Sequence, residues 1–222
     1  MKSLLLFLLM VGPAAVAQTA TPPNIPAVGR HLADFIPVGY GILHNGQAIG
    51  DLNHDGKADV AVVVGPTAED TLALASRLPP RLLLVLFRTT TGYALAAQSR
   101  RAVWAKADGG PLGDPFAGVT IKNESLLIQH DVGGNWGHGQ TVRFRFQQGA
   151  FYLIGETQEY SRHAPDCDQL PFPPRYDYRD TNFITGEYEE IRTSEECRLL
   201  VKKRGRRPPQ PLRRLADYAV QP

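Results

Sequence analysis

Residues 51–59 carry oxygen-bearing side chains at a spacing that suits a metal ion. Asp51, Asn53 and Asp55 occupy alternate positions, and Asp59 follows later in the same stretch. A loop that coils round an ion presents every second side chain to the centre, and such oxygen ligands suit a hard cation. The backbone carbonyl of Lys57 would point at the same centre. We therefore predict a calcium site made of Asp51, Asn53, Asp55, Lys57 and Asp59, in which the ion is structural.

The residues after this loop indicate which kind of calcium loop it is. An EF-hand requires Glu at the twelfth position and a following helix, but the twelfth position from Asp51 is Val62, and residues 60–64 read as a strand. The loop resembles the calcium loops of FG-GAP repeats, as in the propellers of integrin α-subunits, where a similar loop leads directly into a strand. Only one copy is present, so the resemblance implies the same ligand set and no propeller. The alternative is a polar turn without metal.

A looser resemblance covers residues 32–203. It rests on Phe35-Ile36-Pro37 before the loop, on glycine-rich residues 109–116, on a strand ending at His130, and on an aromatic hairpin over residues 144–155. These features are similar to those of a group of bacterial exported proteins of uncharacterised function. The resemblance implies a single domain in the cell envelope and leaves the activity open.

Residues 130–138 are the other candidate site. His130, Trp136 and His138 lie in a stretch rich in glycine, which reads as a flexible loop. It would bind a ligand through Trp136 or a zinc ion through the histidines; the alternative is a hairpin loop whose Trp packs on the sheet. An envelope hydrolase would use this loop together with the loop at 109–115. The chain has no Gly-x-Ser-x-Gly or His-Glu-x-x-His motif, so we favour a non-catalytic binding or structural role.

The first residues have the pattern of a secretory signal. Lys2 precedes an apolar run at 4–11, and small residues up to Ala17 offer a cleavage site before Gln18. The run is shorter than the roughly 20 residues of a transmembrane helix. We predict a signal peptide over 1–17, a flexible lead-in over 18–29, a domain over 30–201 and a basic, Pro-rich tail over 202–222. The protein is then periplasmic or secreted and not transmembrane.

The chain contains two cysteines, Cys167 and Cys197. In an exported protein an isolated pair is most simply a disulfide. Such a bridge would stabilise the fold by roughly 3–4 kcal/mol on the chain-entropy model. The alternatives are two free thiols or a redox pair, and the absence of a C-x-x-C spacing disfavours the redox pair.

Positive charge is concentrated at the C-terminus. Residues 198–222 contain eight Lys or Arg and one acid, Asp217, although the net charge of the whole chain is only +2. By composition, residues 202–222 read as a solvated tail. The alternative is a contact with anionic lipid, lipopolysaccharide or nucleic acid. We expect no specific nucleic-acid partner, because Tyr218 is the only aromatic side chain in this stretch.

Hydrophobic patterning predicts strands along most of the chain. Residues 60–64 and 82–88 are almost continuously apolar, which is typical of strands buried on both faces. Residues 141–147 alternate apolar and polar side chains, and Asn123-Glu124, Gln148-Gly149 and Thr185-Gly186 are candidate hairpin turns. We predict an all-β domain, mainly antiparallel, as a sandwich or open barrel. At most one or two short helices are expected, at residues 32–36 and 71–78.

Overall fold

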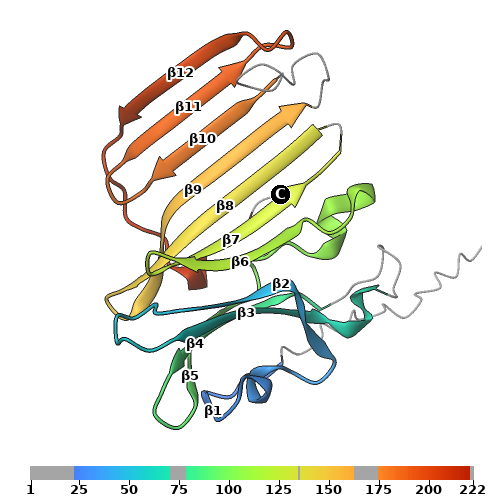
Figure 1. Ribbon diagram of the computed structural model, residues 1–222, viewed down its shortest axis with the longest axis vertical. Coiled ribbons are helices and arrows are strands. Elements are labelled where there is room, and N and C mark those ends of the chain that lie inside the picture. Colours follow the sequence, from blue (N-terminus) through green and yellow to red (C-terminus); the bar gives the residue numbers. More distant parts are fainter. Residues whose placement is uncertain (1–22, 71–78, 135, 163–174, 221–222) are drawn as a thin grey trace, which may run out of the picture.

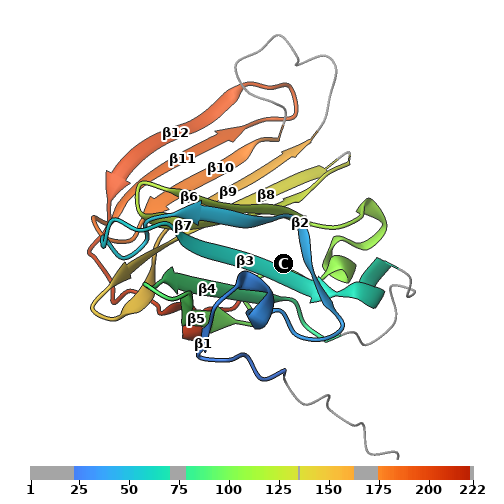
Figure 2. The ribbon, with the colours of Figure 1, turned by 60° about the horizontal axis from the view of Figure 1, so that its bottom comes forward.

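Two antiparallel β-sheets make up the computed structural model, which describes residues 23–70, 79–134, 136–162 and 175–220. Figure 1 shows the larger sheet packing part of its width against the smaller one, and Figure 2 shows the same layers from another side. The all-β, antiparallel, sandwich-like class predicted from the sequence is confirmed.

The small sheet has five strands in the order β1-β5-β4-β3-β2. Every pairing in it is antiparallel. The strands are β1 (Val28–Gly29), β2 (Tyr40–Gly50), β3 (Asp59–Pro66), β4 (Leu82–Arg88) and β5 (Tyr93–Ser99).

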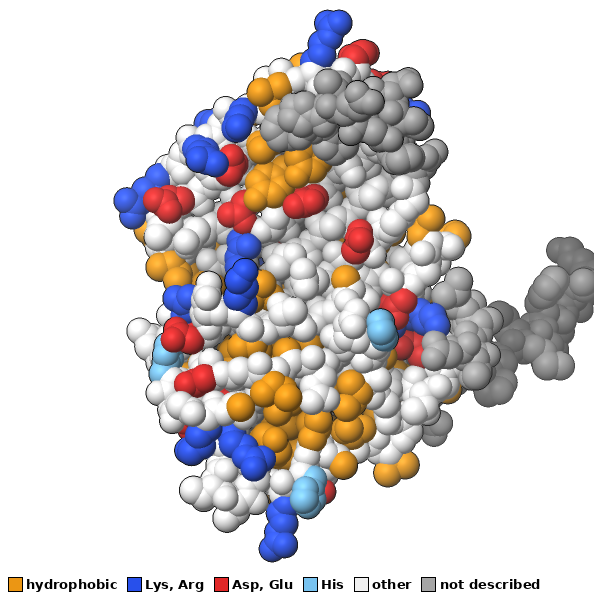
Figure 3. Space-filling model, in the orientation of Figure 1, with side chains coloured by type: hydrophobic (Ala, Val, Ile, Leu, Met, Phe, Trp, Pro, Cys, Tyr) orange, Lys and Arg blue, Asp and Glu red, His pale blue; other side chains and the backbone are white. Residues whose placement is uncertain are grey.

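The large sheet is a seven-stranded meander in the order β12-β11-β10-β9-β8-β7-β6. Its strands are β6 (Phe116–Lys122), β7 (Ser125–Val132), β8 (Trp136–Gln147), β9 (Ala150–Arg162), β10 (Asp177–Asn182), β11 (Glu187–Thr193) and β12 (Leu199–Arg206). Strands β10–β12 extend past the small sheet (Figure 1). Positive and negative side chains lie side by side over this extension (Figure 3), where Arg204 pairs with Glu189 at 3.0 Å and Arg207 with Glu190 at 2.9 Å.

Tight turns with left-handed backbone join neighbouring strands of the large sheet. Asn123 and Glu124 have φ of 48° and 58°, and Gln148 and Gly149 have φ of 50° and 76°. Two consecutive residues with positive φ give the turn whose twist matches that of the flanking strands. Both turns lie where the sequence predicted them.

Strands β3 and β4 are buried on both faces, as their continuous apolar runs predicted. Val60, Val62 and Val64 contact one cluster, which includes Phe35 from the N-terminal segment. Ala61 and Val63 contact the other cluster, between the two sheets. A strand alternates its side chains between faces, so two apolar layers have to cover this sheet.

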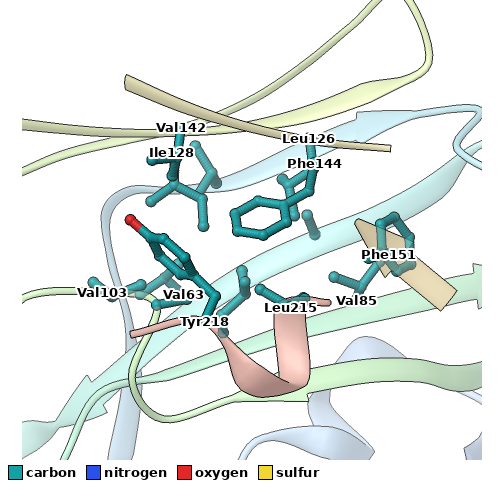
Figure 4. Close-up of a cluster of buried hydrophobic side chains, with 14 of the residues drawn as sticks. Val63, Val85, Val103, Leu126, Ile128, Val142, Phe144, Phe151, Leu215 and Tyr218 are labelled. Atoms are coloured by element: carbon teal, nitrogen blue, oxygen red, sulfur yellow. The ribbon is translucent and has the colours of Figure 1, made fainter. Parts of the chain in front are cut away.

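The core between the sheets draws on the predicted alternation in β8. Val142 and Phe144 are fully buried in it, whereas Arg143 lies on the opposite face and pairs with Asp180. Leu215 and Tyr218, from the C-terminal segment, complete the cluster (Figure 4). The Tyr218 ring packs edge-on against Phe144, with 5.3 Å between ring centroids.

The two sheets meet closely where β2 passes β6. A Cβ on Gly50 would lie 2.6 Å from a methyl carbon of Ile121, so only glycine permits this approach. The Asn45 side-chain amide donates to the Ala117 carbonyl at 3.2 Å. Sequence patterning did not predict β2, whose residues do not alternate regularly between buried and exposed. Its pairing with β3 is also interrupted between Ile42 and Gln47.

Helical structure among the described residues consists of short 3-10 turns. They are η1 (Leu32–Phe35), η2 (Thr67–Asp70), η3 (Lys106–Leu112) and η5 (Leu215–Asp217). The turn expected at 32–36 is therefore present, and the helix expected at 71–78 lies outside the described residues. Much of the stretch expected as a loop at 109–115 belongs to η3.

The C-terminal segment differs from the solvated tail expected over residues 202–222. Residues up to Arg206 form β12, paired with β11, and Leu215 and Tyr218 are only 2% and 4% exposed. The Leu153 N–H donates to the Arg213 carbonyl at 2.8 Å, and the Val220 N–H donates to the Arg101 carbonyl at 2.7 Å. The composition shows that this segment is basic. It does not show that strand pairing and two buried side chains hold the segment against the sheets.

Replacing Tyr218 tests whether this segment belongs to the core. Removal of a buried aromatic side chain typically costs about 3–5 kcal/mol, so we expect Tyr218→Ala to lower the free energy of unfolding by that amount in urea titrations. Asp217→Ala, at an exposed neighbour, should change it by no more than about 0.5 kcal/mol. Equal, small effects of the two substitutions would contradict the packing described here.

Candidate functional site

The loop at residues 51–59 connects β2 to β3 in the small sheet. Gly50 and Asp59 are directly opposed across the two strands. His54 and Gly56 have φ of 65° and 76°, so the backbone turns sharply twice within the loop. Positive φ is strained for most residues and easy for glycine, which explains why glycine occupies position 56.

The loop backbone curls round its own oxygen-bearing side chains. The two carboxylate oxygens of Asp51 accept the N–H groups of His54 at 2.8 Å and Gly56 at 2.9 Å. Asn53 accepts the Asp55 N–H at 3.1 Å, and Asp55 accepts the Lys57 N–H at 2.9 Å. Asp and Asn side chains that bond to the backbone a few residues on are typical of such turns. The alternating positions singled out in the sequence are therefore the ones that shape the loop.

Asp59 has a different setting from the other loop carboxylates. It is fully buried, and its two oxygens accept the N–H groups of Leu52 at 2.9 Å and Arg88 at 2.8 Å. Burial raises the pKa of its carboxyl group, an effect that the hydrogen bonds from Arg88 and Leu52 oppose. Asp59 thus ties both ends of the loop together and fastens them to β4.

The donor set fits calcium in its chemistry, since it offers carboxylate and amide oxygens that retain further lone pairs. A cation already lies near it, because the Lys57 ammonium is 3.2 Å from the Asp55 carboxylate. Among the residues that the structure describes, no three His, Cys, Asp or Glu side chains are arranged to hold a metal. The loop oxygens face backbone N–H groups instead.

The sequence suggested that His130 and His138 lie in a flexible loop, and this expectation is wrong. They occupy β7 and β8, and His130 is only 2% exposed. The His130 Nε2 atom accepts the backbone N–H of Trp104 at 3.2 Å, and the two rings stack with centroids 4.8 Å apart. His138 stacks on Tyr160 at 4.1 Å. Trp136 begins β8, and its side chain lies outside the described residues.

Burial governs the ionisation of His130. Burial, together with the positive charge of Arg81, lowers the pKa of the imidazole to about 4, while Asp114 opposes the change. Burial also lowers the pKa of His138. His130 Nδ1, His138 Nε2 and Trp104 Nε1 are buried with no hydrogen-bond partner among the described residues. His130 therefore belongs to the packed interior and has no access to an external substrate, whereas His138 is half-buried.

Beside them lies an ion network around a buried arginine, which the sequence did not reveal. The Arg81 side chain is 1% exposed and donates to Glu69 and Asp114 at distances from 2.6 to 3.2 Å. It also donates to the Trp104 carbonyl at 3.1 Å. Burial alone would raise the pKa of Asp114, but the hydrogen bonds from Arg81 and from the Phe116 N–H hold it below its usual value. No local pattern marks Arg81, because its partners lie 12 and 33 residues away.

The hydrolase alternative combined the stretch at residues 130–138 with the loop at 109–115. His130 is packed behind Trp104. Asp114, from the second stretch, is engaged by Arg81.

Cys197 lies next to β12 and is 8% exposed. Its predicted partner, Cys167, lies outside the described residues, so the disulfide stays a prediction. No helix within the described residues is both long and apolar enough to cross a membrane.

Comparison with protein-family models, with curated proteins and with solved structures finds no match for this chain.

The buried His130 makes stability depend on pH. Its folded-state pKa of about 4 lies below the usual 6.5, so the unfolded chain binds the extra proton and stability falls as pH drops from 6.5 towards 4. We expect a loss of about 2–3 kcal/mol from this residue between pH 7 and 4.5, measured by urea unfolding. His130→Gln should lose less over this interval than the unmodified protein. His44→Gln, at an exposed position on β2, is the control for the loss of an imidazole. An unchanged pH dependence in His130→Gln would contradict the assignment.

Proposed function

We propose that this chain is an exported calcium-binding β domain with a non-catalytic binding or structural role in the cell envelope. The observation that carries the calcium proposal is the course of the 51–59 loop. Its backbone curls round oxygen atoms at alternate positions and leads directly into a strand. An ion there would be held by Asp51, Asn53, Asp55 and the Lys57 carbonyl, with the buried Asp59 closing the loop.

Calcium would offset most of the negative charge of three carboxylates concentrated in a short hairpin loop. Binding would exchange the Lys57 ammonium on Asp55 for the ion, and it would fix the angle at which β3 leaves the loop. Asp59 already joins the loop to β4, so stiffening the loop would stabilise the central strands of the small sheet. This is a structural role, for which the ion needs no free coordination position that a substrate could fill.

Export is proposed on the N-terminal pattern, since residues 1–17 lie outside the described residues. A non-catalytic role is favoured because the candidate catalytic histidine, His130, is packed inside. The basic residues of β12 that the sequence offered to anionic surfaces are partly paired within the sheet, as with Arg204 and Glu189. We therefore propose no role for them in surface attachment.

Thermal unfolding of the mature protein tests the calcium proposal. A ligand at one hundred times its dissociation constant stabilises by about 2.7 kcal/mol, which for a chain of this size raises Tm by about 5–10 °C. We expect this shift with calcium, little shift with magnesium, and none with a chelator present. Asp51→Ala and Asp55→Asn should abolish it.

Lys57→Gln is the matched control for these variants. It removes the ammonium group but keeps the backbone carbonyl, so the calcium shift should be retained or increased. Asp59→Ala is a poor probe, because loss of the bonds to Leu52 and Arg88 would destabilise the fold without calcium. An unmodified protein whose Tm does not respond to millimolar calcium would refute the calcium site.

Export and the disulfide are tested together by intact-mass analysis of protein recovered from the periplasm or medium. We expect a mature chain beginning at Gln18 whose mass rises by two hydrogens on reduction, because Cys167 and Cys197 would be joined. A chain recovered in the cytoplasm with residues 1–17 still attached would refute export. A mass unchanged by reduction would refute the disulfide.

A further inference from the structure

A cavity of about 250 Å³ lies between strands β8 and β9 and the C-terminal segment. It is smaller than pockets for drug-sized ligands, which span about 300–1,000 Å³, but much larger than the roughly 30 Å³ of one water molecule. No residue of the 51–59 loop lines it. The lining side chains used below are Gln140, Glu156, Gln158, Phe183, Arg213 and Tyr218.

Gln140 lines this cavity and holds Glu156 in place. The residue is 4% exposed, and its Nε2 donates to Glu156 Oε1 at 2.7 Å. Turning the amide over would place its oxygen against the carboxylate oxygen, so the carboxylate identifies which amide atom is the nitrogen. The Gln140 Oε1 atom is buried with almost no accessible surface, so a molecule in the cavity does not reach it. Gln140 therefore acts on the cavity through the hydrogen bond that it donates to Glu156.

Glu156 supplies the acceptor. Its Oε1 atom also accepts the Gln158 side-chain amide at 3.0 Å, so both amides converge on the same oxygen. The other carboxylate oxygen accepts no hydrogen bond among the described residues. The cavity therefore offers this second Glu156 oxygen as an acceptor, and the Gln140 and Gln158 amides hold the carboxylate in place.

Opposite charges on the lining favour a neutral occupant. Arg213 carries a positive charge at the same cavity as the Glu156 carboxylate, which disfavours both a cation and an anion. The Tyr218 hydroxyl, which points toward Val142 and Ile128 in Figure 4, adds a group that both donates and accepts. Phe183 supplies an apolar surface beside these polar groups.

We infer that this cavity binds a neutral polyhydroxylated molecule of the size of one sugar ring. Each hydroxyl of such a molecule donates and accepts, so it can donate to Glu156 and accept from Arg213 and Tyr218. The apolar face of a sugar ring suits an aromatic neighbour such as Phe183. The site is separate from the calcium loop and does not depend on it.

The test follows the side-chain amide resonances of ¹⁵N-labelled mature protein by NMR. The probes are D-glucose, D-galactose and N-acetyl-D-glucosamine, with ethylammonium and acetate as charged comparators. At least one sugar should shift the Gln140 and Gln158 amides saturably, and neither charged probe should. Titrations in calcium and in chelator should agree, so a failed calcium site and a failed sugar site are separate results.

Two variants decide whether Glu156, and the Gln140 amide that holds it, carry the binding. Gln140→Leu and the isosteric Glu156→Gln should each weaken sugar binding by about ten-fold, and Glu156→Gln guards against unfolding of the first. Gln98→Leu, at an exposed position on β5, should leave the affinity unchanged. The inference is overturned if no sugar shifts these amides, if a charged probe binds instead, or if both variants bind as tightly as the unmodified protein.

Discussion

Apolar side chains project from both faces of β3 and β4, and most of the architecture serves to cover them. One face is covered by the N-terminal segment through Phe35. The other face is covered by the large sheet, through Val142 and Phe144 of β8. Because β10–β12 are not needed for this covering, they are free to extend past the small sheet and rely on ion pairs and backbone pairing. The same covering explains why the C-terminal segment returns to the sheets after β12.

The polar interior lies at one end of the shared core. Arg81 is held there by Glu69 and Asp114, and its position at the start of β4 joins the small sheet to the segment that leads into β6. Breaking a buried ion pair by removing one partner costs about 3–5 kcal/mol, because the remaining charge is left uncompensated. His130 lies beside this network and stays neutral, which adds no further charge to the interior. The network therefore acts as a structural joint between the layers.

The sequence predicted those elements whose signal is local. Continuous apolar runs identified β3 and β4, alternation identified β8, and turn residues such as Asn123 located hairpins. Features that depend on distant partners were missed. Strand β2 is interrupted in its pairing, Arg81 finds its partners far along the chain, and Tyr218 is buried although its neighbours are basic and Pro-rich. For the candidate site, the spacing of Asp51, Asn53 and Asp55 indicated which side chains shape the loop. It did not indicate that the Asp59 carboxylate is buried and accepts hydrogen bonds from the backbone N–H groups of Leu52 and Arg88.

Leu215 and Tyr218 follow every named strand in the sequence, yet they fill space at the centre of the sandwich. A ribosome therefore makes the strands of both sheets before it makes the two side chains that complete the core between them. In the nascent chain, Val142 and Phe144 lack part of their packing surface until Leu215 and Tyr218 have emerged.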